Sequence, residues 1–172
     1  MRHSARSPRA SWRAASSCSE LVRELVFTLE FRGRAGAVAG LPSQRRARTS
    51  APSQSLRTIL TADGVQASVE ILPGDTAELD SRVERFPDGS FVEDGRISYG
   101  RAGAITFVTS GRGIVRPSPI AGWTEGAVLW NVTGGDGRFA GACGLITSSF
   151  TVSPDGEVID HHIARIYIQD LH

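Results

Sequence analysis

The sequence predicts an all-β fold, a small antiparallel up-and-down barrel of about eight strands that follows a disordered N-terminal extension. Three observations carry this prediction. From Leu56 onward, short segments alternate apolar and polar residues with the period of two that is typical of strands. No interior segment combines helical periodicity with helix caps. Turn dipeptides separate the segments at hairpin spacing: Asp63-Gly64, Pro73-Gly74, Asp88-Gly89, Asp94-Gly95 and Asp155-Gly156.

The predicted strands follow one another through short connections. They are Leu56–Thr61, Val65–Leu72, Ala77–Phe86, Arg96–Tyr99, Ala104–Thr109, Ala127–Thr133, Leu145–Val152 and Glu157–Ile168. Such a series suits either an up-and-down barrel or a sandwich. We favour the barrel, because closure removes the exposed edges of the terminal strands. The predicted barrel domain covers residues 56–172.

Residues 1–55 are predicted to lie outside the barrel. Residues 1–19 hold four Arg, no acid and many Ser and Ala, a composition that suits a transit peptide, a disordered tail or a wrongly assigned start. The apolar segment Leu21–Phe31 fits either a helix capped by Ser19 or a strand. The stretch from Arg32 to Ser55 is rich in Gly, Ala, Pro, Ser and Arg. We expect a linker there, because so little apolar area does not offset the entropy of ordering.

Charge and composition narrow the range of partners. The chain has no Lys, which excludes a Schiff-base Lys and a P-loop. Residues 1–57 hold eleven Arg against three acids, whereas residues 58–172 hold eight Arg against fifteen acids. The predicted barrel is therefore acidic, and we expect no nucleic-acid partner. In the predicted linker, Arg45, Arg46 and Arg48 are expected to be solvated, with contact to nucleic acid or membrane as a weaker alternative.

Two further compositional features concern location. No apolar run approaches the ~18 residues of a membrane-spanning helix, so we expect no membrane partner. The two cysteines show neither metal-ligand spacing nor a disulfide framework, which favours a reducing, cytoplasmic location. A homo-oligomer is compatible with the sequence.

The last predicted strand indicates a partly polar lumen. One of its faces carries Val158, Asp160, His162, Ala164, Ile166 and Ile168, and the other carries Ile159, His161, Ile163, Arg165 and Tyr167. Both faces mix apolar and polar groups, as expected of a barrel that holds a small molecule rather than only aliphatic side chains. The alternation does not decide which face points inward, because a shift of one residue exchanges the two.

The segment 134–144 carries five glycines and superficially resembles a phosphate-binding loop. It precedes a predicted strand rather than a helix, and no Lys follows it, so nucleotide binding is not expected. We interpret it as a turn and bulge at a corner of the barrel, with Phe139 closing the barrel end.

With its neighbours, the same segment carries a family resemblance. Residues 128–152 resemble the calycin-like barrels grouped with allene oxide cyclase and the dirigent proteins, most of all their small bacterial members, several of which serve natural-product pathways. The shared element is G-G-x-G-R-F-x-x-A-x-G, here Gly134, Gly135, Gly137, Arg138, Phe139, Ala142 and Gly144. Residues 82–89 and 156–160 are also similar, and the resemblance covers about residues 56–168.

The resemblance implies a lumen that holds an apolar, often reactive small molecule and needs neither a metal nor an organic cofactor. Allene oxide cyclases steer epoxide opening and ring closure, and dirigent proteins orient phenoxy radicals. We therefore expect a cofactor-free cyclase or isomerase that acts on an apolar metabolite. The alternative is a non-catalytic barrel that binds or orients its ligand.

Glu84 and His162 are the catalytic candidates. A Glu84 carboxylate directed into an apolar lumen would have a raised pKa and serve as general acid or base, whereas on the outer wall it would form a cross-strand ion pair. His162 shares its face with aliphatic residues. His161 points to the opposite face, so the two adjacent His residues do not form a metal site.

The candidates for substrate contact are Trp130, Ser148, Phe150 and Tyr167. Trp130 and Tyr167 would form an aromatic wall, with packing in the core or on the outer surface as the alternative. Ser148 and Phe150 share one face of their predicted strand.

Overall fold

The computed structural model describes residues 22–169, so the interpretations of residues 1–19 fall outside the described residues. Within this range the chain forms eleven strands and two short 3-10 helices. The strands are β1 Val22–Val38, β2 Leu41–Ala51, β3 Gln54–Thr61, β4 Gly64–Ile71, β5 Ala77–Arg85, β6 Ser90–Tyr99, β7 Ala104–Thr109, β8 Gly113–Pro117, β9 Thr124–Gly135, β10 Cys143–Val152 and β11 Glu157–Gln169, and the helices are η1 Gly100–Ala102 and η2 Gly137–Phe139.

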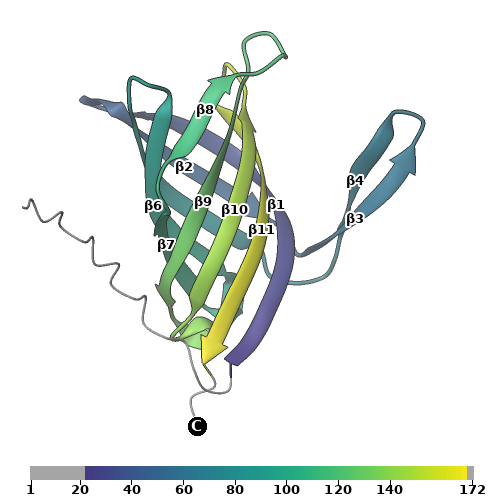
Figure 1. Cartoon of the computed structure of the whole chain (residues 1–172). Coiled ribbons are helices and arrows are strands. Elements are labelled where there is room, and N and C mark those ends of the chain that lie inside the picture. The colour runs from purple at the N-terminus through teal and green to yellow at the C-terminus, as the bar shows by residue number, and fades with distance from the viewer. Residues whose placement is uncertain (1–21, 170–172) are drawn as a thin grey trace, which may run out of the picture.

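Eight strands close into an antiparallel up-and-down barrel, which confirms the predicted fold class (Figure 1). Going round the wall, the order is β1, β2, β5, β6, β7, β9, β10 and β11, and β11 pairs with β1 along thirteen residues. The short strand β8 lies beyond β7 between the same neighbours, β6 and β9. Closure pairs both edges of the sheet, so the barrel wall presents no long free edge.

The predicted domain boundary at Leu56 is wrong, because β1 and β2 are barrel strands. β1 joins β11 to β2, and β2 joins β1 to β5. Their inward positions near the middle of the wall are small, including Gly33, Ala47 and Thr49. A Cβ at Gly33 would lie 2.2 Å from the carbonyl oxygen of Arg48. The residues of the predicted linker therefore form part of the barrel wall despite their low apolar content. Side chains of the other strands fill most of the lumen beside them.

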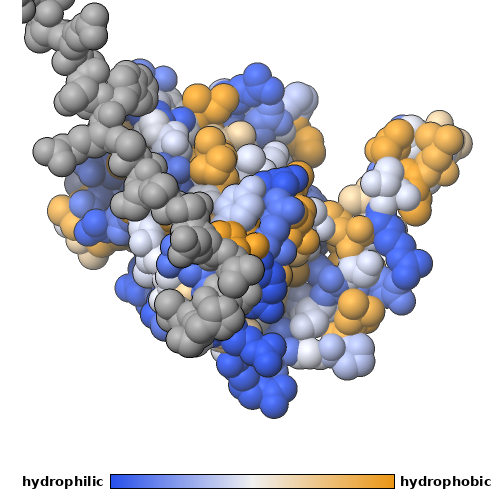
Figure 2. All heavy atoms as spheres, turned by 60° about the horizontal axis from the view of Figure 1, so that its bottom comes forward, coloured by the Kyte–Doolittle hydropathy of each residue, from blue (hydrophilic) through white to orange (hydrophobic). Residues whose placement is uncertain are grey.

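The two segments that were predicted to open the barrel, β3 and β4, form a separate two-stranded sheet. This hairpin is inserted between β2 and β5 and projects from the barrel wall (Figure 1). Apolar side chains gather on it (Figure 2), and Leu60 and Val65 are 83% and 73% exposed. Their alternation had the strand period, but the period does not specify which sheet a strand joins.

The predicted turn at Asp94-Gly95 is also wrong, since both residues lie inside β6. Gly95 pairs with Ser81 of β5 and Phe107 of β7. A Cβ at Gly95 would lie 2.8 Å from the Ser81 Cβ and 2.9 Å from the Phe107 ring. This glycine therefore makes room for an inward aromatic ring rather than a chain reversal.

Large side chains fill one half of the lumen. They include Phe31, Ile97, Ile105, Phe107, Trp130, Ile146 and Ile166, each at most 1% exposed. At the end of this half, Phe139 of η2 is buried, with its ring centroid 5.0 Å from that of Tyr99, as expected for the glycine-rich corner. We call this end the plugged end. The other end, formed by the β1–β2, β5–β6, β8–β9 and β10–β11 connections, is called the loop end.

Two findings bear on location. Within residues 22–169, no helix has the length and apolarity to span a bilayer. Cys143, at the start of β10, is disulfide-bonded, so the cysteine content no longer argues for a reducing compartment.

Candidate functional site

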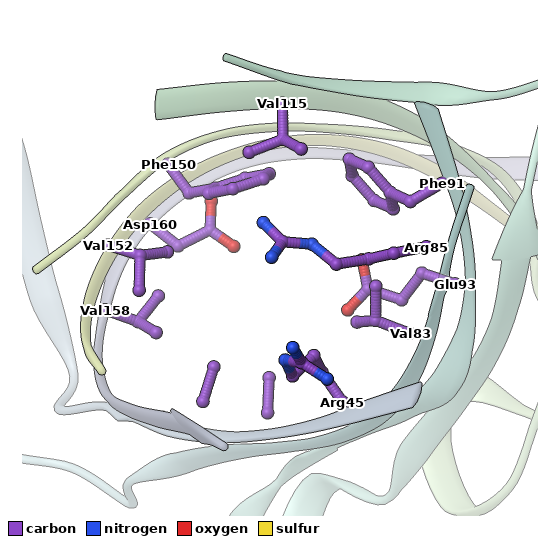
Figure 3. Close-up of a pocket in the computed structure, with 12 residues that line it drawn as sticks. Arg45, Val83, Arg85, Phe91, Glu93, Val115, Phe150, Val152, Val158 and Asp160 are labelled. Atoms are coloured by element: carbon purple, nitrogen blue, oxygen red, sulfur yellow. The ribbon is translucent and has the colours of Figure 1, made fainter. Parts of the chain in front are cut away.

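A pocket of about 130 Å³ occupies the lumen towards the loop end (Figure 3). Cavities of ~150 Å³ hold a single aromatic ring, so the enclosed part suits one ring or a short chain. The lining residues are Ala35, Arg45, Ala47, Val83, Arg85, Phe91, Glu93, Val115, Phe150, Val152, Val158 and Asp160. The set combines an apolar wall with two acids and two guanidinium groups.

Two buried carboxyl groups face the pocket. Glu93 of β6 is 8% exposed and Asp160 of β11 is 7% exposed. Each accepts a hydrogen bond from a serine on a neighbouring strand: the Ser81 hydroxyl lies 2.5 Å from Glu93 Oε1, and the Ser148 hydroxyl lies 2.7 Å from Asp160 Oδ1. The inward phase of β5, β6, β10 and β11 brings these four side chains into one lumen.

The environment of Glu93 favours its neutral form. Burial raises the pKa of Glu93 to about 8, and the negative charge of Asp160 adds to the rise. Asp94 adds a smaller contribution, and the Ser81 hydrogen bond opposes the shift. The nearby Trp130 indole also opposes it, although the indole N–H reaches no hydrogen-bond acceptor among the described residues. At neutral pH the Glu93 carboxyl therefore carries a proton that it can donate.

Asp160 has a second polar contact, which comes from His162 on the same strand. His162 Nε2 lies 2.9 Å from Asp160 Oδ2, so the tautomer protonated at Nε2 donates to this carboxylate. The imidazole is 2% exposed and packs between two rings, with centroids 4.4 Å from Phe31 and 4.9 Å from Trp130. Ser148 and His162 thus fix the orientation of the Asp160 carboxylate towards the pocket.

Two arginines enter the lumen from adjacent strands near the loop end. Arg45 lies on β2 and Arg85 on β5, and Figure 3 shows the Arg85 side chain extending across the pocket. Arg45 donates to the carbonyl oxygens of Pro42 and Gln44. Burial lowers the pKa of Arg85, and the charge of Arg45 lowers it further. The two guanidinium groups therefore repel each other in this position.

Glycines on the facing wall make space for two phenyl rings. Phe91 and Phe150 meet edge to face, with centroids 5.8 Å apart. A Cβ at Gly113 would lie 2.3 Å from the Phe91 ring, and a Cβ at Gly126 would lie 2.5 Å from the Phe150 ring. The rings therefore lie close against the backbone of β8 and β9, which leaves room in the lumen beside them for the pocket.

Four of the six predicted site residues point into the barrel. Phe150 lines the pocket, whereas Trp130, Ser148 and His162 are buried next to its acids. His162 points into the barrel, although it contacts Asp160 rather than the cavity itself. The catalytic and binding roles of these residues stay predictions.

The other two predicted site residues, Glu84 and Tyr167, lie on the outer face of the barrel. Glu84 is exposed, and its neighbours Val83 and Arg85 take the inward positions. Tyr167 lies between the inward residues Ile166 and Ile168. Neither side chain can therefore reach the pocket, and the structure has the outer-face position that was given as the alternative for each.

Five residues of the site, Ser81, Glu93, Arg45, Arg85 and Asp160, were not among the predicted site residues, and Arg45 lines the pocket although it was expected to be solvated. Asp160 carried a usable signal, because it shares a face with His162. Neighbouring side chains of a strand point to opposite faces, so Arg85 points into the lumen if Glu84 points outward. Arg45 carried no such signal, since its whole segment resembled a linker.

The fold and the site define a class of protein: a small closed β-barrel, plugged at one end, with a largely apolar pocket towards the loop end that contains two acids and two guanidinium groups. Within residues 22–169, no group of three or more His, Cys, Asp and Glu side chains is arranged to hold a metal ion. Comparisons with protein-family models, curated proteins and solved structures each find no match to this chain.

Proposed function

We propose that this protein is a cofactor-free cyclase or isomerase that acts on a small metabolite with an apolar body in the barrel lumen. The observation that carries the proposal is the pairing of a protonated Glu93 with Asp160 in one buried pocket. Two carboxyl groups whose environments differ in this way are suited to act as acid and base in one reaction. The resemblance to allene oxide cyclase-like and dirigent-like barrels supports the same proposal, with bacterial natural-product biosynthesis as its setting.

In the proposed reaction, Glu93 donates its proton to a carbonyl or epoxide oxygen of the substrate. Asp160 accepts a proton from a substrate C–H bond, whose electron pair forms the new bond of the isomerised product. The product has then gained one proton and lost one, so its composition is unchanged. Return of the proton from Asp160 to Glu93 resets the enzyme. Confinement in the pocket adds to this chemistry, since holding reacting atoms in attack geometry contributes on the order of 7–11 kcal/mol in favourable cases.

The test uses the full chain and a metabolite extract in deuterated water. We expect a compound to be converted into an isomer that has the same mass after return to ordinary water but a different chromatographic position. Its carbon-bound hydrogens should contain no deuterium, because the proposed step forms an O–H bond and breaks a C–H bond. Glu93→Gln and Asp160→Asn should each abolish the conversion, because one removes the acid and the other the base. Glu84→Gln is the matched control, since this carboxylate lies on the outer wall. Conversion that persists in both pocket variants would overturn the proposal.

A non-catalytic barrel that binds or orients its ligand is the second candidate. The full set of hydrogen bonds on Asp160 favours it, because a structural carboxylate would be held in the same way. Native mass spectrometry after exposure to the extract separates the candidates. An unchanged metabolite retained by the protein favours binding, whereas a released isomer favours catalysis. A cytoplasmic location and a homo-oligomer stay predictions.

A further inference from the structure

We propose that the ligand of this pocket carries an anionic group, a carboxylate or a phosphate monoester, which Arg45 and Arg85 hold near the loop end while the apolar body points into the lumen. This inference rests on the proposed function in that both concern the same pocket. It adds the chemical class of the ligand and the direction in which the ligand enters.

The first argument is the balance of charge around the pocket. Its lining contains two guanidinium groups and two carboxyl groups. Glu93 is neutral at neutral pH, because burial raises its pKa to about 8. Arg45 and Arg85 therefore face the single carboxylate of Asp160, and one positive charge is left over. A carboxylate would balance this charge, and a phosphate monoester, which carries about −1.5 to −2 at pH 7, would more than balance it.

The second argument is the isolation of Arg85. Arginines on the outer wall lie against acids of neighbouring strands, as Arg46 does with Asp80 and Arg82 with Asp94. Arg85 is half-buried but forms no ion pair or hydrogen bond with another described residue. A guanidinium taken out of water without a partner is unfavourable, so its position is best explained by a partner that the ligand supplies.

The third argument is the distribution of polarity along the lumen. Phe91, Phe150, Val115 and Val83 surround the extended side chain of Arg85 (Figure 3). A ligand whose anionic group meets the guanidinium would place its apolar part against these side chains. The enclosed volume of about 130 Å³ limits that part to one ring or a short chain. The pocket thus suits an amphiphilic anion rather than a wholly apolar molecule.

The experiment compares probes that share a phenylpropyl body and differ in the head group. Phenylbutyrate, its neutral amide phenylbutanamide and phenylpropyl phosphate are titrated into the full chain by calorimetry at neutral pH. We expect at least one anion to bind about tenfold or more tightly than the amide, since hydrogen bonds to charged groups are the stronger ones. Which of the two anions binds more tightly shows whether the ligand carries a carboxylate or a phosphate.

Variants then show which residue causes the preference for the anion over the amide. Arg85→Gln should bring the anion down to the affinity of the amide, whereas Arg57→Gln on the projecting hairpin, which removes the same charge, should leave the preference unchanged. Equal affinity of all three probes for the wild type, a preference that survives in Arg85→Gln, or no binding of any probe at millimolar concentration would overturn the inference. If Arg85→Gln does not fold, the wild-type comparison still decides.

The doubly substituted Glu93→Gln, Asp160→Asn variant separates this inference from the proposed function. Both guanidinium groups remain in that variant, so we expect it to keep or strengthen the preference for the anion. A preference for the anion in a protein that converts no metabolite would leave the ligand class standing and refute only the catalytic proposal.

Discussion

Glu93 and Asp160 face one lumen from opposite sides of the barrel. Glu93 lies on β6 and Asp160 on β11, and the wall order places three strands between these two in either direction. The two carboxyl groups line the same pocket, and the charge of Asp160 contributes to the raised pKa of Glu93. Residues 67 positions apart in the chain therefore form one pair, which only closure of the barrel brings together.

The shifted pKa of Glu93 predicts a specific dependence of stability on pH. Its value in the folded protein, about 8, lies above its ordinary value of 4.5. Between these values the folded state keeps a proton that the unfolded chain has lost, so the free energy of unfolding falls as the pH rises. Across the whole window the loss is on the order of 5 kcal/mol.

Glu93→Gln has no proton to lose at this position, so its free energy of unfolding should rise relative to the wild type between about pH 5 and about pH 9. Urea denaturation at the two pH values measures the difference. Glu84→Gln, on the outer wall, should keep the wild-type dependence. If Glu93→Gln also keeps it, the carboxyl is not held neutral in the folded state.

Ser148→Ala removes one of the two hydrogen-bond contacts to the Asp160 carboxylate. Leaving a buried charged acceptor without this donor should lower the free energy of unfolding by ~1–3 kcal/mol. Ser149→Ala is the matched control, because the adjacent hydroxyl is exposed on the outer face. Urea denaturation at neutral pH compares the two. Equal losses in both variants would show that the hydrogen bond to Asp160 does not stabilise the fold.

Gly126→Ala tests the space that keeps the lumen open. The new Cβ would lie 2.5 Å from both the Phe150 ring and the carbonyl oxygen of Ile114, so the ring and the backbone of the wall must move. Overpacking of this kind is expected to lower the free energy of unfolding by ~1–3 kcal/mol and to push the ring into the pocket.

The phenylbutyrate titration should therefore show weaker binding to Gly126→Ala. Gly36→Ala is the control, since a Cβ there meets no atom within 4 Å. An unchanged affinity in Gly126→Ala would mean that Phe150 does not border the ligand.

The position of β1 and β2 predicts that residues 56–172 do not fold alone. Without these two strands, β11 and β5 each lose one of their two partner strands and the barrel opens. We expect this fragment to show no cooperative thermal unfolding by circular dichroism. Replacing residues 54–72 with a short Gly-Ser link should instead leave the barrel folded, because the hairpin forms its own sheet. A cooperatively folded 56–172 fragment would contradict the closure described here.

The sequence by itself determined the fold class and most strands after Ala77. Period-two alternation is a local property, and the turn at Asp155-Gly156 lies where it was predicted, between β10 and β11. The corner at residues 134–144 was also predictable, because positive-φ glycines such as Gly137 and Gly141 mark a reversal rather than a strand. The inward face of β11 was one of two alternatives, which local pattern alone does not separate.

The tertiary structure decided which segments close the barrel and which side chains share the lumen. β1 and β2 are ordered by pairing with β11 and β5, so the small side chains from Gly33 to Ala51 gave no local sign of a barrel wall. The alternation of β5 directs Glu84 to the outer face and Arg85 into the lumen. Closure of the barrel brings Glu93 and Asp160 to one pocket, and burial there favours the neutral form of Glu93. Both depend on residues distant in sequence, which is why the pattern along the chain could not reveal them.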